Sequence, residues 1–148
     1  MKSIFNAEAR TQLHDRIARL TPDSKPAFGK MNVNQMVVHC TGGIDMFIGR
    51  LKVAPKSGPL SIPLLRYLVI YVLPWPHGAP TAPELIPPAN PGDFRENVAK
   101  LQEAMERIGA RGSEASFDPH PAFGALKGKD VGALVGRHVD HHLRQFGV

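Results

Sequence analysis

With 148 residues the chain has the usual length of one domain and is short for two, so we expect a single domain over residues 1–148. Its net charge of +5 comes from dispersed basic residues that alternate with acidic ones, a pattern that argues against a nucleic-acid partner. The sequence offers no secretory signal and no apolar stretch of about 20 residues, so we expect a cytoplasmic protein with no membrane partner.

The first predicted helix follows Asn6, whose side chain suits an N-cap, and Pro22 is expected to end it. A stripe of apolar residues at spacings of three and four supports this helix: Phe5, Ala9, Leu13, Ile17 and Leu20. The stripe therefore gives the helix one face that can pack in a core.

The second predicted helix has the strongest start signal, because Asn32 and Gln35 have the spacing of a capping box. We expect this helix to begin at Met31 or Asn32, and Gly42 with Gly43 would let a neighbouring helix approach closely. Its apolar stripe is Val33, Met36, Val37, Cys40, Ile44 and Phe47.

Two further helices are predicted in the second half of the chain. The third runs from about Asp93 to Ile108, with Gly109 expected just after its end, and the fourth runs from near Gly128 to about Gly147. The inward positions of these two helices are Val98, Leu101, Met105 and Ile108, then Val131, Leu134 and Val135. No alternating pattern is long enough to build a sheet, so the fold class is predicted to be all-α.

A long proline-rich connection, from about residue 53 to residue 91, separates the second and third helices. It contains the apolar run LLRYLVIYVL, residues 64–73, which is more apolar than the surface of a small helical bundle usually is. Tyr67, Tyr71 and Trp75 are expected to be buried. We therefore predict that the connection folds over the bundle as a cap or forms the surface of a homodimer.

Histidines carry the functional signal. His138 falls near the middle of the inward face of the fourth helix, and His142 lies one turn later on that face, whereas His141 is nearer the edge. An i,i+4 histidine pair can bind one metal ion, and His39 on the second helix is the best third donor. A lone buried histidine is more often a hydrogen-bonded core residue than a ligand. Two imidazoles buried together without a ligand, however, would lose their hydration without gaining a compensating interaction. No role is assigned to His14, His77 and His120.

Cys40 adjoins His39, so a catalytic thiol has to be considered. It falls in the apolar stripe of its helix, and nothing beside it would lower its pKa, so a small buried hydrophobe is the better interpretation.

The segment MNVNQMVVHC, together with HPAFG and the ending GRHVDHHLRQFGV, resembles the DinB-like superfamily, closest to a branch of small bacterial proteins that end in HHLRQFG. The resemblance covers nearly the whole chain. It implies an up-down-down-up four-helix bundle in which three histidines hold a metal ion, and these map onto His39, His138 and His142. The superfamily includes mycothiol-dependent maleylpyruvate isomerase and transferases that use mycothiol or bacillithiol.

A divalent ion, zinc or nickel, held by three neutral imidazoles would keep an open coordination position. The leading hypothesis is an S-transferase or isomerase that activates a low-molecular-weight thiol against a small-molecule substrate. The alternatives are a metal-dependent hydrolase and a non-enzymatic metal-binding or assembly protein. A hydrolase usually needs a carboxylate near the ion, and Asp140 points roughly opposite His138, which favours the thiol reaction.

Overall fold

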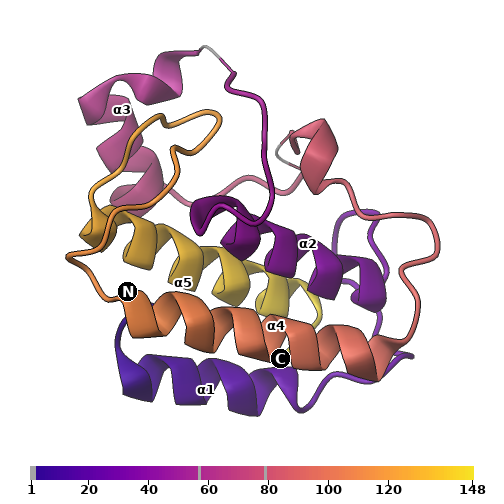
Figure 1. Cartoon of the computed structure of the whole chain (residues 1–148). Helices are drawn as coiled ribbons and strands as arrows, with labels where there is room; N and C mark the ends of the chain where they lie inside the picture. The colour runs from indigo at the N-terminus through magenta and orange to yellow at the C-terminus, as the bar shows by residue number, and fades with distance from the viewer. Residues whose placement is uncertain (1–2, 57, 79) are drawn as a thin grey trace.

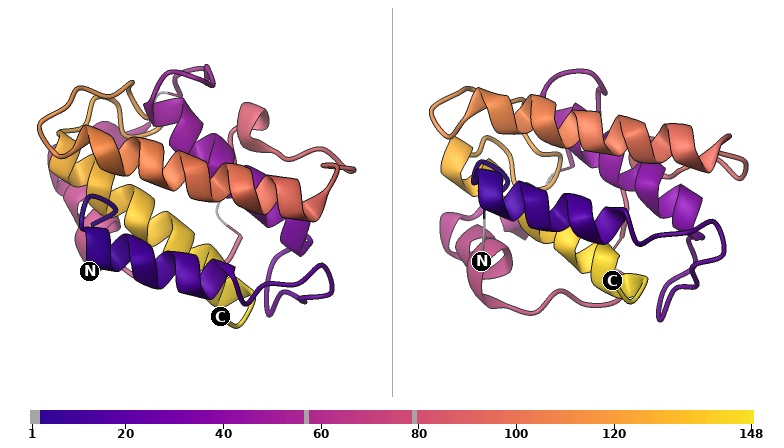
Figure 2. Two further views of the ribbon diagram at one scale, coloured as in Figure 1. Left: turned by 60° about the horizontal axis from the view of Figure 1, so that its bottom comes forward. Right: turned by 90° about the horizontal axis from the view of Figure 1, so that it is seen from below.

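The structure is a computed structural model that describes residues 3–56, 58–78 and 80–148, and the regular elements in these residues are all helical. The long helices are α1 (Ala7–Ile17), α2 (Val33–Phe47), α4 (Phe94–Arg111) and α5 (Gly128–Gln145). Both α1 and α2 pack against α4 and α5, so the four helices close a ring around one core (Figure 1, Figure 2). The predicted all-α fold class is confirmed.

The predicted N-caps form as the sequence indicates. Asn6 accepts a hydrogen bond of 2.8 Å from the backbone N–H of Ala9 at the start of α1. Asn32 and Gln35 form a complete capping box at the start of α2, so the predicted start of that helix is confirmed. Asp93 is the N-cap of α4, where its side chain accepts a hydrogen bond from the backbone N–H of Glu96. These side chains satisfy N–H groups that have no partner inside the helix.

Two predicted helix ends are wrong by several residues. α1 ends at Ile17, well before Pro22. α4 continues through Gly109 to Arg111 and ends where Gly112 adopts a φ of 74°. A glycine is needed at position 109, because a Cβ there would lie 2.7 Å from Nε of Arg10 on α1. This glycine serves the packing of α4 against α1 and does not terminate the helix.

The core lies between the four long helices and contains the apolar stripes that the sequence predicts. All six stripe residues of α2 are at most 3% exposed, and the predicted residues of α5 are also buried. From α4 the core takes Leu101, Met105 and Ile108, whereas Val98 is only partly buried. α2 and α5 thus have their apolar faces turned toward each other, which sets the position of their histidines.

The connection between α2 and α4 folds as short helices: η1 (Pro59–Ser61), α3 (Pro63–Tyr67), the π-helical turn η2 (Leu68–Val72) and η3 (Pro83–Leu85). η2 packs on α5, and η3 packs on α2. Trp75 is partly buried, but Tyr67 is 55% exposed and Tyr71 is 36% exposed, so the prediction that both tyrosines are buried is wrong. The physical reason is that this helical segment buries only Ile70, on the side that faces the bundle.

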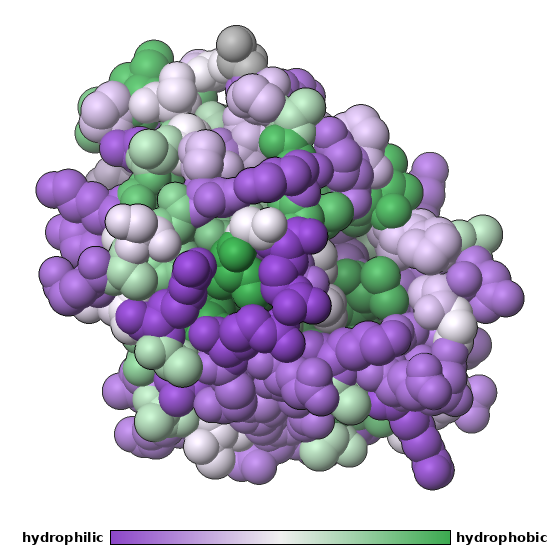
Figure 3. All heavy atoms as spheres, in the orientation of Figure 1, coloured by the Kyte–Doolittle hydropathy of each residue, from purple (hydrophilic) through white to green (hydrophobic). Residues whose placement is uncertain are grey.

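The face of the molecule shown in Figure 3 is not uniform in polarity. Over α1 and α4 it is mostly hydrophilic, whereas apolar spheres lie at the upper left, where Figure 1 shows α3, and in the middle of the view. Among the described residues, no helix combines the length and the apolar character that crossing a bilayer requires.

Candidate metal centre

Three histidine rings meet between α2 and α5. Nε2 of His138 lies 3.0 Å from Nε2 of His39 and 3.1 Å from Nε2 of His142. The ligating nitrogens of all three lie within 4.8 Å of one another, as they must to share one ion. His39 and His142 are buried, and His138 is partly exposed. The structure thus brings together the three residues that the sequence analysis selects, and they could hold a metal ion.

The outer nitrogens of two of these rings have partners that fix their tautomers. Nδ1 of His39 lies 3.0 Å from the carbonyl oxygen of Leu85, which can only accept, so this nitrogen carries the proton. Nδ1 of His142 lies 2.8 Å from Oε1 of Gln145. Gln145 donates from its Nε2 to the carbonyl oxygen of Phe28, and this bond orients the amide with its oxygen toward His142. In both neutral rings Nε2 is therefore left with a lone pair.

The direction of these two lone pairs indicates whether a metal ion fits the site. Both point at Nε2 of His138, which carries at most one proton and can donate well to only one of them. At least one pair of nitrogens would therefore face each other lone pair to lone pair, which is unfavourable without a cation between them. Two imidazole ligands at about 2.1 Å from a tetrahedral ion are separated by about 3.4 Å, slightly more than the distances seen here. The donor set therefore fits a metal ion after a small opening.

The lowered pKa values of the three histidines disfavour a proton as the cation between their Nε2 atoms. Burial lowers the pKa of His138 well below 6.5, and the neighbouring His142 and His39 lower it further. Burial is also the largest cause of the lowered pKa of His39, and it lowers the pKa of His142 to about 4. Near neutral pH all three rings are neutral, which is the form that binds a metal ion.

Aromatic side chains border the triad on the side of His142 and His138. The ring of His141 lies between those of Phe28 and Trp75, with centroid distances of 5.4 and 5.6 Å. The ring of His77 stacks on Phe28 with a centroid distance of 3.7 Å and an interplanar angle of 4°. His141 is not part of the metal-binding group, as its helical phase predicts. The connection therefore covers this part of the site, because it contributes both Trp75 and His77.

The other reactive side chains near the triad are engaged elsewhere. Asp140 forms ion pairs with Arg16, at 2.6 Å, and with Arg144, at 2.9 Å, on the side of α5 that faces α1. Cys40 is fully buried, and burial raises the pKa of its thiol, so it is not a nucleophile. Both observations agree with the roles that the sequence analysis assigns to these residues.

The remaining histidines have structural partners. Nδ1 of His120 accepts hydrogen bonds of 3.1 and 3.2 Å from the backbone N–H groups of Ala122 and Phe123, which closes a tight loop before α5. Burial lowers the pKa of His120 to about 4, and an unprotonated Nδ1 is what these bonds require. Nε2 of His14 lies 2.8 Å from a carboxylate oxygen of Glu106, so His14 joins α1 to α4.

Two residues that support the triad, Gln145 and Leu85, are not among those predicted from the sequence. Gln145 lies three residues after His142, a spacing that places two side chains on one helix face and could have indicated it. Leu85 acts through its backbone carbonyl, which carries no sequence signal. Gly29, with a φ of 81°, approaches Gln145 so closely that a Cβ would lie 2.5 Å from its Nε2.

Two hollows in the described surface lie away from the triad. They have volumes of about 230 and 420 Å³, and both adjoin Lys127 and Lys129 at the start of α5. None of the three histidines lines either hollow. The triad is thus not at the base of these hollows.

Comparison with known proteins places the chain in a family. No curated protein and no solved structure matches the chain. The family described as "Protein of unknown function (DUF1569)" matches residues 5–147, a range that contains His39, His138 and His142. Because this match spans nearly the whole chain, the protein belongs to the DUF1569 family.

Proposed function

We propose that His39, His138 and His142 hold one divalent metal ion, zinc or nickel, and that the protein is a metal-dependent enzyme acting on a small molecule. The observation that carries the proposal is the convergence of two Nε2 lone pairs on Nε2 of His138, at 3.0 and 3.1 Å. Imidazole nitrogen is a preferred ligand of both ions.

An ion held by three neutral imidazoles supplies a Lewis acid with an open position, which lowers the pKa of a thiol or a water that binds there. The residues of the chain prepare this position. The carbonyl of Leu85 and the amide of Gln145 hold two rings in the tautomer that leaves Nε2 free to ligate. Trp75 and Phe28 give the site a largely apolar border, where electrostatic interactions are stronger than in water.

We propose that the substrate activated at this site is a low-molecular-weight thiol, used in an S-transfer or isomerisation reaction. The partners of the triad are a backbone carbonyl, an amide oxygen and aromatic rings. Among the described residues no hydrogen bond or ion pair joins a carboxylate to the three rings, which favours a thiol over a hydrolase that uses a carboxylate base close to the ion. A thiol needs no such base once it has lost its proton to solvent.

The DinB-like relationship is part of the proposal. The arrangement of four long helices with one histidine on α2 and two on α5 supports it, as does the ending HHLRQFG. On this basis we propose the up-down-down-up bundle of that superfamily as the architecture.

Elemental analysis of the protein purified without an affinity tag tests the metal site. About one zinc or nickel ion per chain is expected in the wild type, and the variants His138→Ala and His142→Ala should lose tight binding. His141→Ala is the matched control, because this ring contacts Trp75 as that of His138 does but lies outside the triad. Metal-free wild type that takes up no zinc after chelator treatment would overturn the site, as would greater loss in His141→Ala.

A thiol titration of the cobalt-substituted protein tests the reaction class. A change in the visible spectrum, with release of one proton per thiol bound, is expected if sulfur enters the coordination shell. Inhibition by the thiol together with turnover of simple esters would favour a hydrolase instead. A loaded protein that takes up no thiol and hydrolyses nothing would favour a structural metal that joins α2 to α5.

A further inference from the structure

One face of the connection remains apolar and exposed. Seven large side chains in residues 62–73, called the apolar face below, are between 36% and 66% exposed: Ile62, Leu64, Leu65, Tyr67, Tyr71, Val72 and Leu73. Together they expose on the order of 700 Å², more than the roughly 300–600 Å² of the largest apolar patch on a typical monomer. A surface of this size indicates a binding partner.

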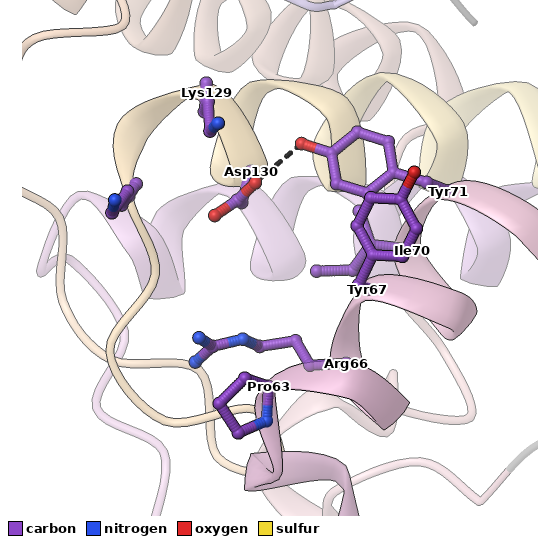
Figure 4. A pocket seen from close by; sticks show the side chains of 8 residues that line it. Pro63, Arg66, Tyr67, Ile70, Tyr71, Lys129 and Asp130 are labelled. Atoms are coloured by element: carbon purple, nitrogen blue, oxygen red, sulfur yellow. Dashed lines mark hydrogen bonds between the residues drawn. The ribbon is translucent and has the colours of Figure 1, made fainter.

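The segment that carries the apolar face is tethered to the bundle by hydrogen bonds. Arg66 donates to the carbonyl oxygens of Phe123 and Ala125, and Tyr71 donates to Asp130 at 2.6 Å (Figure 4). A second tether comes from α5, where Arg137 donates to two carbonyl oxygens of η2 at 2.9 Å. Ordering this segment therefore costs little when a partner binds.

The apolar face is also uncharged. Arg66 is the single ionisable cation in residues 62–73, and its guanidinium turns toward the loop before α5 and away from the exposed side chains. Covering residues 62–73 therefore buries no unpaired charge from this segment, which would cost several kcal/mol. In a two-fold dimer each patch meets its own copy, so an uncharged patch avoids repulsion between like charges at the centre.

We propose that a second copy of this chain covers the apolar face, giving a two-fold homodimer. A stable interface buries about 800 Å² on each partner, and the face supplies most of that area. A bilayer surface is the rival occupant, because Lys127 and Lys129 line the same hollow as Tyr67 and Tyr71. Interfacial helices, however, carry several Lys or Arg residues on their own polar face, whereas residues 62–73 have one, already bound to carbonyls. The second copy therefore fits better.

Light scattering and sedimentation equilibrium across the micromolar range test the dimer. The wild type should be a dimer, and Leu64→Glu should raise the dissociation constant by about 100-fold or more, because each interface would then contain two carboxylates. Leu64 is 66% exposed, so the fold should be unaffected, which circular dichroism checks. Ile86→Glu is the matched control, since Ile86 is 62% exposed but lies outside the apolar face.

Cysteine cross-linking gives a second measurement. The natural Cys40 is fully buried, so Leu65→Cys and Val72→Cys each introduce the one accessible thiol of the chain. Rapid disulfide-linked dimer formation is expected from at least one of them and not from Ile86→Cys. A monomeric wild type, a dimer unaffected by Leu64→Glu, or a monomer that binds phosphatidylglycerol vesicles through Leu64 would each overturn the proposal.

Discussion

Gly43 on α2 leaves the space in which the ring of His138 lies. A Cβ at this position would be 3.2 Å from both Cε1 and Nδ1 of His138, which is tighter than ordinary van der Waals contact. The adjacent Gly42 faces the methyl groups of Leu85 and Leu51, at 3.3 and 3.5 Å, and these can shift by small rotations. Two neighbouring glycines of one helix therefore differ in what an added methyl group would disturb.

We predict that Gly43→Ala weakens metal binding by about tenfold or more, because it displaces a ligand ring by a few tenths of an ångström. Gly42→Ala should change the affinity little, and alanine should favour helix formation at both positions by up to about 1 kcal/mol. Competition with a chromophoric chelator measures the affinities, and urea unfolding of the metal-free proteins measures the stabilities. Equal affinities in the two variants would show that His138 adjusts freely.

At the level of single residues, the sequence predicts the ligands better than their support. His138 and His142 can be placed from helical phase alone, because both lie on the strongly patterned α5. Gln145 and Leu85 act through contacts that depend on where the loop around Phe28 and the helix η3 pack. The positions of this loop and of η3 are set by tertiary packing, and no periodic pattern in the sequence indicates them.

The helix starts are predictable because a cap is a local interaction between residues two or three apart. The helix ends are less predictable. α4 continues past Gly109, because a glycine inside a helix can also provide room for a side chain such as Arg10. The connection is predicted to pack as a cap, and it covers the triad through Trp75 and Leu85, but its tyrosines stay exposed. The composition of this segment alone does not show whether its apolar side chains are buried against the same chain or stay exposed.

The capping box of α2 allows a test at the level of one helix. Asn32→Ala removes the acceptor for the backbone N–H of Gln35, at 2.8 Å, and should lower the free energy of unfolding by about 1 kcal/mol. Asn32→Asp keeps an acceptor at the N-cap and should leave stability nearly unchanged. Thermal and urea unfolding of metal-free protein measure both. Equal losses in the two variants would mean that the side-chain bond is not what stabilises this start.

Across the whole molecule, five histidines have a lowered pKa, and burial is the largest cause for each: His39, His120, His138, His141 and His142. In the unfolded chain these rings titrate near 6.5. Below that pH the unfolded state therefore binds more protons than the folded state. The histidines thus make the metal-free protein sensitive to mild acid.

We predict that the metal-free protein loses stability as the pH falls from about 6.5 to about 4, where His142 and His120 take up protons in the folded state. A pKa lowered from 6.5 to about 4 corresponds to a free energy on the order of 3 kcal/mol for one such residue, and this stability is fully present above about pH 6.5 and lost by about pH 4. Urea unfolding between pH 7 and pH 4 measures this loss.

His120→Asn separates the loop from the metal site, because an asparagine oxygen can accept the two backbone N–H bonds without titrating. Its stability should fall less steeply with acid than that of the wild type, while zinc affinity stays the same. Loading the wild type with zinc should steepen the acid dependence, since protons then also compete with the ion for the three ligands. A stability that is flat between pH 7 and pH 5 in metal-free protein would show that the histidines are solvated and that their rings do not form the enclosed cluster described here.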